Sequence, residues 1–138
     1  MPLNSDLSMK NFIKILLLFL FYVFYTTSYA QSLSNVVENT EASFYVRTDN
    51  LRKSGNSVDF WQITDFKQPK LNKKGETYLS MEQHLIIDCA ASTQNLVFVK
   101  VFSANMLSGK MIASGSLSQR NPIPYGTSLE VIKNFVCR

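Results

Sequence analysis

The chain has 138 residues, which is room for one domain, and its 14 basic and 10 acidic residues give a net charge of +4 at pH 7. Lys10, Lys14 and Asp6 lie within the first thirty residues, so twelve basic and nine acidic residues remain beyond them, a net charge of +3. This mild positive charge permits attraction to an acidic partner, but it does not indicate a nucleic-acid-binding protein.

The first thirty residues have the pattern of a secretory signal peptide. Lys10 and Lys14 precede an unbroken apolar run, Ile15–Tyr25, and the small residues Ser28 and Ala30 occupy the two positions that a signal peptidase reads. We therefore expect export with cleavage after Ala30, and a mature protein in the periplasm, at the cell surface or secreted. The alternative is a retained membrane anchor, but the apolar run is shorter than the ~20 residues of a membrane span. No cysteine follows the cleavage point, so we expect no lipid anchor and no stable membrane anchor after cleavage.

The first part of the mature chain predicts a flexible lead-in and then short extended pieces. Residues 31–42 are polar and irregular, so the domain itself is expected over 43–138. The extended pieces are predicted at residues 44–47, 51–53 and 58–66. Asp49-Asn50 is expected to form a turn. Ser54-Gly55-Asn56 is a hairpin signal, because Gly and Asn tolerate the positive φ that tight turns require.

Three more strands are predicted in the second half, at residues 79–89, 94–102 and 111–117. In the first of these, alternate positions are apolar from Leu79 to Cys89, with Gln83 as the exception. This set, Cys89 included, is therefore expected on the buried face of the sheet. The strands at 58–66 and 94–102 carry apolar residues on both faces, which indicates central positions.

A C-terminal helix is predicted over Leu129–Cys137. Thr127 followed by Glu130 is the pattern in which each side chain covers an unpaired backbone N–H of the first turn. The apolar side of the helical wheel is formed by Leu129, Ile132, Phe135 and Val136. Cys137 falls off this stripe, unless the helix has ended by then.

Cys89 and Cys137 are the only cysteines, 48 positions apart. An even cysteine count in a small exported domain favours a disulfide. In the loop-entropy model, a disulfide that closes so long a loop adds roughly 4 kcal/mol to the free energy of unfolding. The alternative is two buried free thiols. With the bridge, the residues predict a small sheet to which one helix is covalently attached.

Short motifs in a characteristic order cover Phe44–Cys137, nearly the whole mature chain. They are Val46–Lys53, Gly55, Val58, Trp61, Asp65, Lys67, Pro69, Thr77–Ser80, Asp88-Cys89, Pro122–Pro124, Gly126-Thr127 and Phe135–Cys137. Together they resemble the surface-adhesin protein E-like family.

The resemblance implies an α+β fold, with an antiparallel β-sheet of about five to six strands and one C-terminal α-helix packed on it. It implies that a disulfide between Cys89 and Cys137 ties the helix to a strand. It further implies bacterial secretion and binding of host extracellular matrix or serum proteins such as vitronectin and laminin.

The sequence offers no constellation for catalysis, metal binding or a cofactor. A nucleophilic triad or a metal site usually needs histidine, and His84 is the only one. Strand parity places it opposite Leu85 and Cys89, as a surface or half-buried side chain. The bridged cysteines would leave no thiolate, and the spacing of the acidic residues brings no two together as an acid–base pair. We therefore expect a non-enzymatic protein without metal or cofactor.

The candidate binding patch is a polar loop over residues 67–74 that carries Lys67, Lys70, Lys73 and Lys74. Such a loop would present positive charge to an acidic protein segment or a sulfated glycan. The alternative is that the lysines solvate the loop and protect nearby sheet edges from pairing. Trp61, in the middle of a strand, is expected in the core rather than as a contact residue.

Two functions remain open at this point. The first is an exported binding module of the adhesin type, which the lysine loop favours. The second is a resident periplasmic envelope protein with a structural or maintenance role and no host ligand, which the lack of a lipid-anchor cysteine favours.

Overall fold

The computed structural model describes Met9, Asn11, residues 13–16 and residues 32–138, and the chain divides into two units, Met1–Ala30 and Gln31–Arg138. The described residues of the first unit are helical. No helix within the described ranges is long and apolar enough to cross a membrane. Most of the predicted signal peptide and its cleavage point after Ala30 lie outside the described residues.

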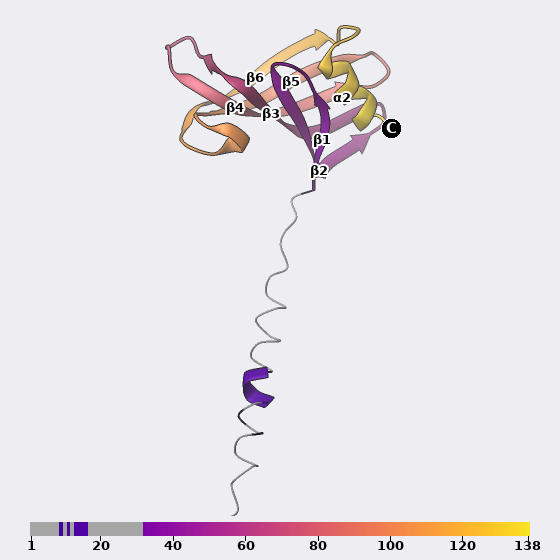
Figure 1. Ribbon diagram of the computed structural model, residues 1–138. Coiled ribbons are helices and arrows are strands. Elements are labelled where there is room, and N and C mark those ends of the chain that lie inside the picture. Colours follow the sequence, from indigo (N-terminus) through magenta and orange to yellow (C-terminus); the bar gives the residue numbers. More distant parts are fainter. Residues whose placement is uncertain (1–8, 10, 12, 17–31) are drawn as a thin grey trace, which may run out of the picture. The chain divides into compact units, whose positions relative to one another are not determined.

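The second unit is a six-stranded sheet with one helix on it (Figure 1). Its elements are β1 (Leu33–Glu38), β2 (Ala42–Ser54), β3 (Ser57–Leu71), β4 (Thr77–Asp88), β5 (Thr93–Phe102), the 3-10 turn η1 (Asn105–Leu107), β6 (Met111–Pro122) and α2 (Ser128–Val136). Every strand pairs antiparallel with the next, so the order in space is the order in sequence. This confirms the α+β fold class, and β3 and β5 are internal strands as predicted.

The first strand corrects the expected flexible lead-in. Leu33–Glu38 forms β1 and pairs with β2, whereas residues 31–42 were expected to be irregular. Val36 and Val37 of this strand pack against the hydrophobic core. Its order comes from pairing and packing with segments distant in sequence, which local composition does not reveal.

The second strand is one continuous element rather than two. The turn expected at Asp49-Asn50 is an irregularity inside β2, where the register with β3 shifts between Arg47 and Arg52. The hairpin at Ser54-Gly55-Asn56 is confirmed, because β2 ends at Ser54 and Gly55 has a φ of +56°. The number of predicted strands agrees with the structure only because the prediction divides β2 into two strands and omits β1.

The loop expected over residues 67–74 is also shorter than predicted. β3 continues to Leu71 through a second irregularity, where the register with β4 shifts between Asp65 and Lys70. Only the segment between Leu71 and Thr77 reverses the chain, closed by a hydrogen bond from Asn72 N to Glu76 O of 3.0 Å.

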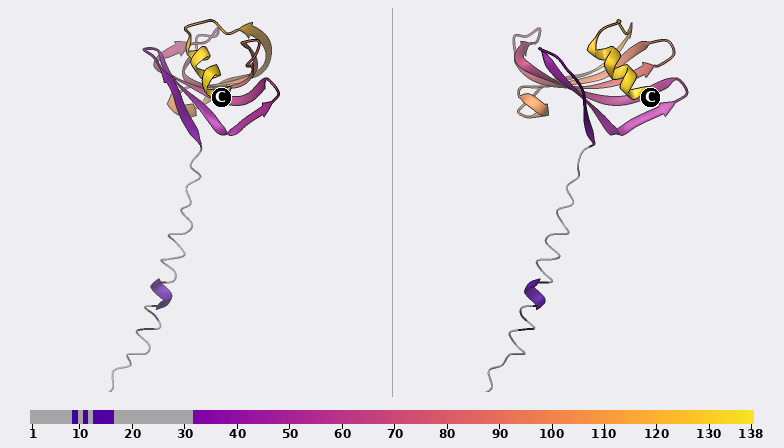
Figure 2. Two further views of the ribbon diagram at one scale, coloured as in Figure 1. Left: turned by 90° about the vertical axis from the view of Figure 1, so that its right-hand side faces the viewer. Right: turned by 45° about the vertical axis from the view of Figure 1, so that its right-hand side comes forward.

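The core lies between α2 and one face of the sheet, which we call the helix face (Figure 2). Its sheet side is formed by Val46, Val58, Phe60, Leu85 and Ile87, and α2 contributes Ile132 and Val136. Burying each such side chain stabilises the fold by about 1.5–3 kcal/mol. Leu129 and Phe135 are partly buried against the same cluster, so the predicted apolar stripe of the helix is confirmed.

The predicted alternation of buried and accessible residues holds only in the C-terminal half of β4. Leu85 and Ile87 are buried on the helix face as predicted, but Ser80 and Glu82, on the opposite face, are buried more deeply than Met81. Gln83, the exception in the apolar pattern, lies on the helix face. It accepts hydrogen bonds from Gln62 and Thr64 on β3, at 3.2 and 3.1 Å.

The helix begins and ends close to where the sequence indicated. Thr127 is the N-cap and its Oγ1 accepts from the Glu130 N–H at 3.3 Å. The carboxylate of Glu130 accepts from the backbone N–H of Gly126 at 2.8 Å, one residue before the expected partner. The helix ends at Val136 and Cys137 is its C-cap. Cys137 therefore lies outside the regular helix, and its side chain can turn toward the sheet.

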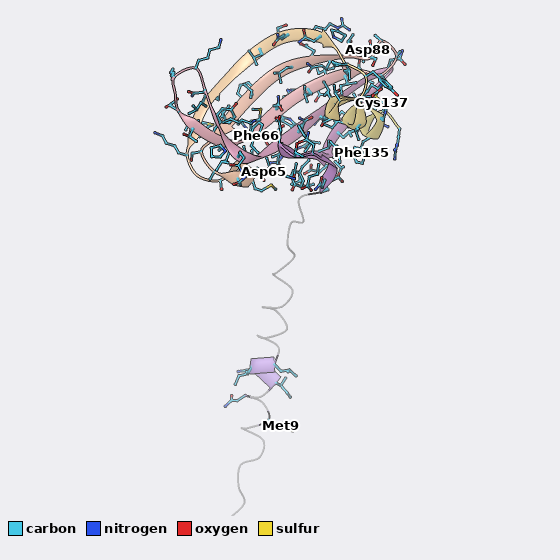
Figure 3. All side chains as sticks on the ribbon, turned by 45° about the horizontal axis from the view of Figure 1, so that its top comes forward. Met9, Asp65, Phe66, Asp88, Phe135 and Cys137 are labelled. Atoms are coloured by element: carbon cyan, nitrogen blue, oxygen red, sulfur yellow. A yellow bond between two sulfur atoms is a disulfide. The ribbon has the colours of Figure 1, made fainter. Side chains whose placement is uncertain are left out.

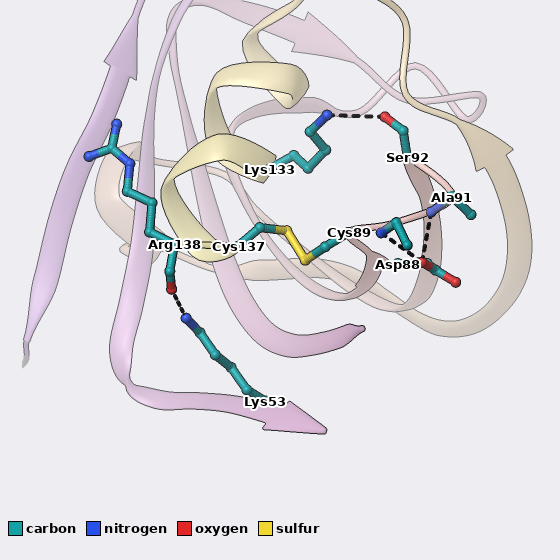
Figure 4. The surroundings of a disulfide bond; sticks show 9 residues. Lys53, Asp88, Cys89, Ala91, Ser92, Lys133, Cys137 and Arg138 are labelled. Atoms are coloured by element: carbon teal, nitrogen blue, oxygen red, sulfur yellow. Dashed lines mark hydrogen bonds between the residues drawn. A yellow bond between two sulfur atoms is a disulfide. The ribbon is translucent and has the colours of Figure 1, made fainter. Parts of the chain in front are cut away.

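The predicted disulfide between Cys89 and Cys137 is confirmed (Figure 4). Cys89 directly follows β4, and the two Cα atoms lie 5.9 Å apart, within the usual range. Lys133 Nζ donates to Ser92 Oγ at 3.2 Å, and Lys53 donates to the backbone oxygen of Arg138. Figure 3 shows Cys137 and Asp88 at the α2 end of the sheet, with Asp65 and Phe66 toward the other end. The C-terminal segment is thus fastened to the end of β2 and to the β4–β5 connection.

The bridge should dominate the stability of this small domain. Replacing Cys137 by Ser should lower the free energy of unfolding by about 2–5 kcal/mol, because the unfolded chain regains the entropy of the 48-residue loop. Urea unfolding of the purified protein measures this difference. Under reducing conditions the variant and the unsubstituted protein should unfold alike. Equal stability without reductant would contradict a stabilising bridge.

Candidate binding surface on the open face of the sheet

The four lysines of the predicted patch do not form one uncompensated positive surface. Lys67 Nζ lies 2.7 Å from Glu38 Oε1, and Lys70 Nζ lies 3.5 Å from Glu41 Oε2. These two lysines therefore join the end of β3 to acidic residues at the β1–β2 connection. The other two, Lys73 and Lys74, are exposed beyond β3. The structure separates the predicted patch into two pairs with different surroundings.

A row of side chains crosses the face of the sheet opposite α2, which we call the open face. The strand register aligns one residue from each of five neighbouring strands: Arg47, Trp61, His84, Phe98 and Ser116. Because side chains alternate along each strand, this row lies on the side away from the core residues Phe60 and Leu85. Pairing thus brings together residues far apart in sequence.

The indole of Trp61 is held at the centre of this row. The His84 ring stacks on it with a centroid distance of 4.8 Å and an interplanar angle of 8°, and Phe98 meets it edge-on at 6.4 Å. Lys100 Nζ lies over the indole, 5.2 Å from its centroid. His84 is fixed in turn, with Nε2 2.7 Å from Asp59 Oδ1. Each aromatic pair contributes roughly 0.5–1.5 kcal/mol beyond its buried area, so the indole is preorganised.

A nearly buried carboxylate lies next to the indole. The Glu82 side chain is 9% exposed, and its Oε1 lies 3.1 Å from Arg47 Nη2 while its Oε2 accepts from Lys100 Nζ at 2.9 Å. A carboxylate with so little access to water requires charged partners. Two cations on one anion leave one net positive charge at this point, and the network fixes the position of Lys100 over Trp61.

Three shallow hollows surround Trp61. Two are polar, one lined with Arg47, Asn50, Glu82 and Lys100 and the other with Asn50, Arg52, Asp59 and His84. The third, of about 520 Å³, is mainly apolar and is lined by Trp61, His84, Val97, Phe98, Lys100, Ser116 and Leu117. Since Trp61 lines all three, one aromatic ring connects an apolar hollow with a cationic one. We call the third the apolar hollow.

The 3-10 turn η1 closes one end of the open face. Asp65 Oδ1 accepts from the backbone N–H of Met106 at 2.7 Å and from Asn105 Nδ2 at 3.1 Å. Ser80 Oγ accepts from the Leu107 N–H at 2.9 Å. This cover explains why Ser80 is fully buried on a face that is otherwise accessible.

Sequence reasoning placed His84 on the correct face but misplaced Trp61. His84 is half-buried and opposite Leu85, as predicted. Trp61 was expected in the core, yet it lies on the open face. The alternation of side chains along the strand could have placed Trp61 on this face. Val58 and Phe60 are the core positions of β3, so Trp61 shares its face with Asp59.

Within the part of the chain that the structure describes, no group of three His, Cys, Asp or Glu residues is arranged to hold a metal ion. The cysteines are bridged, and His84 is engaged by Asp59 and Trp61. What the open face offers is an aromatic and cationic surface without a deep pocket.

The meander sheet, the attached helix and this shallow surface define a small α+β domain suited to binding through a surface. Solved structures of Haemophilus influenzae protein E have the same fold. One has a TM-score of 0.59 at 14% identity and covers 80% of this chain and 87% of that chain, and a second crystal form gives 0.60, covering 80% and 91%. Protein E from non-typeable Haemophilus influenzae gives 0.56 at 14% identity, covering 80% and 78%. At this identity the likeness establishes the fold alone.

The family model for surface-adhesin protein E matches residues 31–138, and the chain belongs to this family. The match confirms the resemblance seen in the motifs and extends it to include β1. No curated protein matches the sequence. Membership indicates an adhesin-like binding protein.

The two kinds of ion pair should differ in their contribution to stability. Arg47→Gln should lower the free energy of unfolding by about 1–3 kcal/mol, because Glu82 keeps its burial and loses a charged partner. Lys67→Gln should cost less than about 1 kcal/mol, since Lys67 and Glu38 are both exposed. Urea unfolding gives both values, and Glu82→Gln added to Arg47→Gln should recover part of the loss. Equal effects of the two single changes would contradict the role given to Glu82.

Proposed function

We propose that this protein is an exported, non-enzymatic binding protein that attaches to a host extracellular protein, of the vitronectin or laminin kind, through its open face. Family membership supports the adhesin class. The observation that carries the choice of surface is Trp61, held by His84 and Lys100 at the junction of three hollows.

The composition of the open face suits a protein ligand. Binding energy at protein interfaces concentrates in Trp, Tyr and Arg side chains near the centre of the contact, surrounded by residues that exclude water. Trp61 and Arg47 occupy this position, with Phe98 and Leu117 beside them. Their contacts with His84 and Glu82 already restrict their rotamers, so less side-chain entropy is lost on binding.

The shape of the surface favours binding over catalysis. Ligand pockets of enzymes are concave and bury most of a small substrate. The hollows around Trp61 are shallow, and they share this side chain as a lining residue. They fit projections of a second protein better than a small molecule.

The predicted lysine patch has a supporting role in this proposal. Lys73 and Lys74 are exposed, whereas Lys67 and Lys70 lie beside Glu38 and Glu41. Exposed lysines act mainly on the rate of encounter with an acidic partner, and salt screens this attraction. Changing all four to Ser should therefore slow association at low salt and leave a ligand held at Trp61 bound.

The binding role of Trp61 is tested by a matched pair of aromatic substitutions. Trp61→Ala should lower affinity for the bound matrix protein by about tenfold or more, the loss typical of a central aromatic contact. Tyr125→Ala removes the aromatic ring of a residue that is 94% exposed in the turn before α2, and this variant should bind normally. Solid-phase binding to immobilised vitronectin, laminin and related proteins measures both, with circular dichroism as a check of folding. Normal binding by Trp61→Ala would contradict the proposed surface.

Localisation separates the adhesin from a resident envelope protein. An adhesin should be digested by protease added to intact cells. Release by osmotic shock together with protection from protease would instead indicate the periplasmic role, with no host ligand.

A further inference from the structure

The sheet ends on one side in an unpaired strand. β6 pairs with β5, and no described strand pairs with its other side. Such an edge presents a row of unpaired backbone N–H and C=O groups that can pair with another chain. The opposite edge, β1, is half as long, carries a register shift at Asn35–Val37 and contacts α2. Only β6 is left as a long, accessible edge.

The charges on β5 and β6 themselves all have one sign, although Arg120 Nη2 also lies 3.8 Å from Asp88 Oδ2 at the end of β4. Between Cys89 and Leu129 the sequence contains no Asp or Glu, and its only charged residues are Lys100, Lys110 and Arg120. Lys110 and Arg120 flank a run of nine uncharged residues in β6, most of them small or polar. An edge strand usually carries charge or proline along its length to prevent pairing, and this one does so only at its ends.

The regular part of the edge lies beside the apolar hollow. Register shifts in the β5–β6 pairing, at Leu96–Phe98 and Val101–Phe102, leave an uninterrupted stretch over Ala113–Ser116. Ser116 and the adjacent Leu117, a residue that is 43% exposed, line the apolar hollow. An extended segment paired here could place an alternate side chain over that hollow.

We propose that β6 is a docking strand, to which an extended acidic segment of the bound partner adds as a seventh strand while one of its apolar side chains enters the apolar hollow. The inference rests on the proposed function, because it names the chemistry of the partner at the same surface. Main-chain hydrogen bonds would supply affinity, and the hollow would supply specificity.

The charges beside β6 and the contacts of the Trp61 indole favour an acidic peptide over a second copy of the chain or a glycan. A second copy of the chain pairing through β6 would bring Lys110 and Arg120 of the two molecules together, which like-charge repulsion opposes. A glycan has no backbone to satisfy the unpaired edge, and the Trp61 ring that a sugar would stack on is already covered by His84 and Lys100. A peptide with carboxylates can pair with the open backbone and with the flanking cations, because Arg120 keeps a 68% exposed side chain although it lies 3.8 Å from Asp88.

A blocked peptide of alternating Glu and Val, roughly nine residues long to match a strand, is the probe. Trp61 is the only tryptophan, so its fluorescence reports on this surface alone. We expect a saturable fluorescence change and slower hydrogen exchange at β6 amides. The same peptide N-methylated at alternate residues, or with Lys in place of Glu, should bind at least about tenfold more weakly, because it cannot pair or is repelled.

Matched charge reversals test the edge from the side of the protein. Lys110→Glu with Arg120→Glu should weaken peptide binding by about tenfold. Lys73→Glu with Lys74→Glu, which makes the same change of net charge in the β3–β4 turn, should slow association at low salt but change affinity at physiological salt by less than about threefold, because its effect on encounter is screened there. Both pairs are exposed, so thermal unfolding should stay close to that of the unsubstituted protein.

Several results would overturn the proposal. They are equal binding of the N-methylated or Lys-containing peptide, protection of amides elsewhere than in β6, equal losses from both charge reversals, or no binding of the Glu–Val peptide. Sedimentation showing a dimer with protected β6 amides would assign the edge to a second copy. If matrix proteins still bind in a Trp61-dependent way while the peptide does not, the docking strand fails and the proposed function stands.

Discussion

The attachment of α2 to one face of the sheet is the constraint on which the rest of the molecule depends. A nine-residue helix is too short to be stable in water by itself, so its order comes from packing and from the bridge. Ile132 and Val136 close the core over Phe60 and Ile87, and the bridge from Cys137 to Cys89 keeps them there. Because α2 is the one α-helix within residues 32–138, it covers one face of the six-stranded sheet and leaves the other accessible.

The open face has to be stable without a covering layer, and its interactions show how. Aromatic rings stack along the sheet instead of packing under a helix, and the carboxylate of Glu82 is enclosed by Arg47 and Lys100 rather than by apolar groups. These contacts hold side chains in fixed positions on an accessible surface. The same interactions that let a half-covered sheet persist in water therefore also preorganise the surface for binding.

Local patterns in the sequence predicted the elements that depend on local chemistry. The capped helix, the glycine turn after Ser54 and the strands around Cys89 follow from residue types at short spacing, and the bridge follows from cysteine count and compartment. What failed depends on distant partners. β1 is ordered by β2 and α2, and the Asp49-Asn50 irregularity remains in a strand because β3 pairs on both sides of it. Trp61 lies outside the core because strand parity decides its face, whereas its residue type favours burial.

The meander topology explains why binding features gather on one side of the domain. Because each strand pairs with its sequence neighbour, the two edges are the first and last strands, and the chain leaves β6 directly for α2. The helix returns across the sheet to contact β1 and β2, so α2 covers the β1 edge of the sheet and leaves the β6 edge uncovered. Along the late edge the chain carries no carboxylate from Cys89 to Leu129. Topology leaves this side uncovered, and the sequence makes it positive, so a partner with extended acidic chain fits it best.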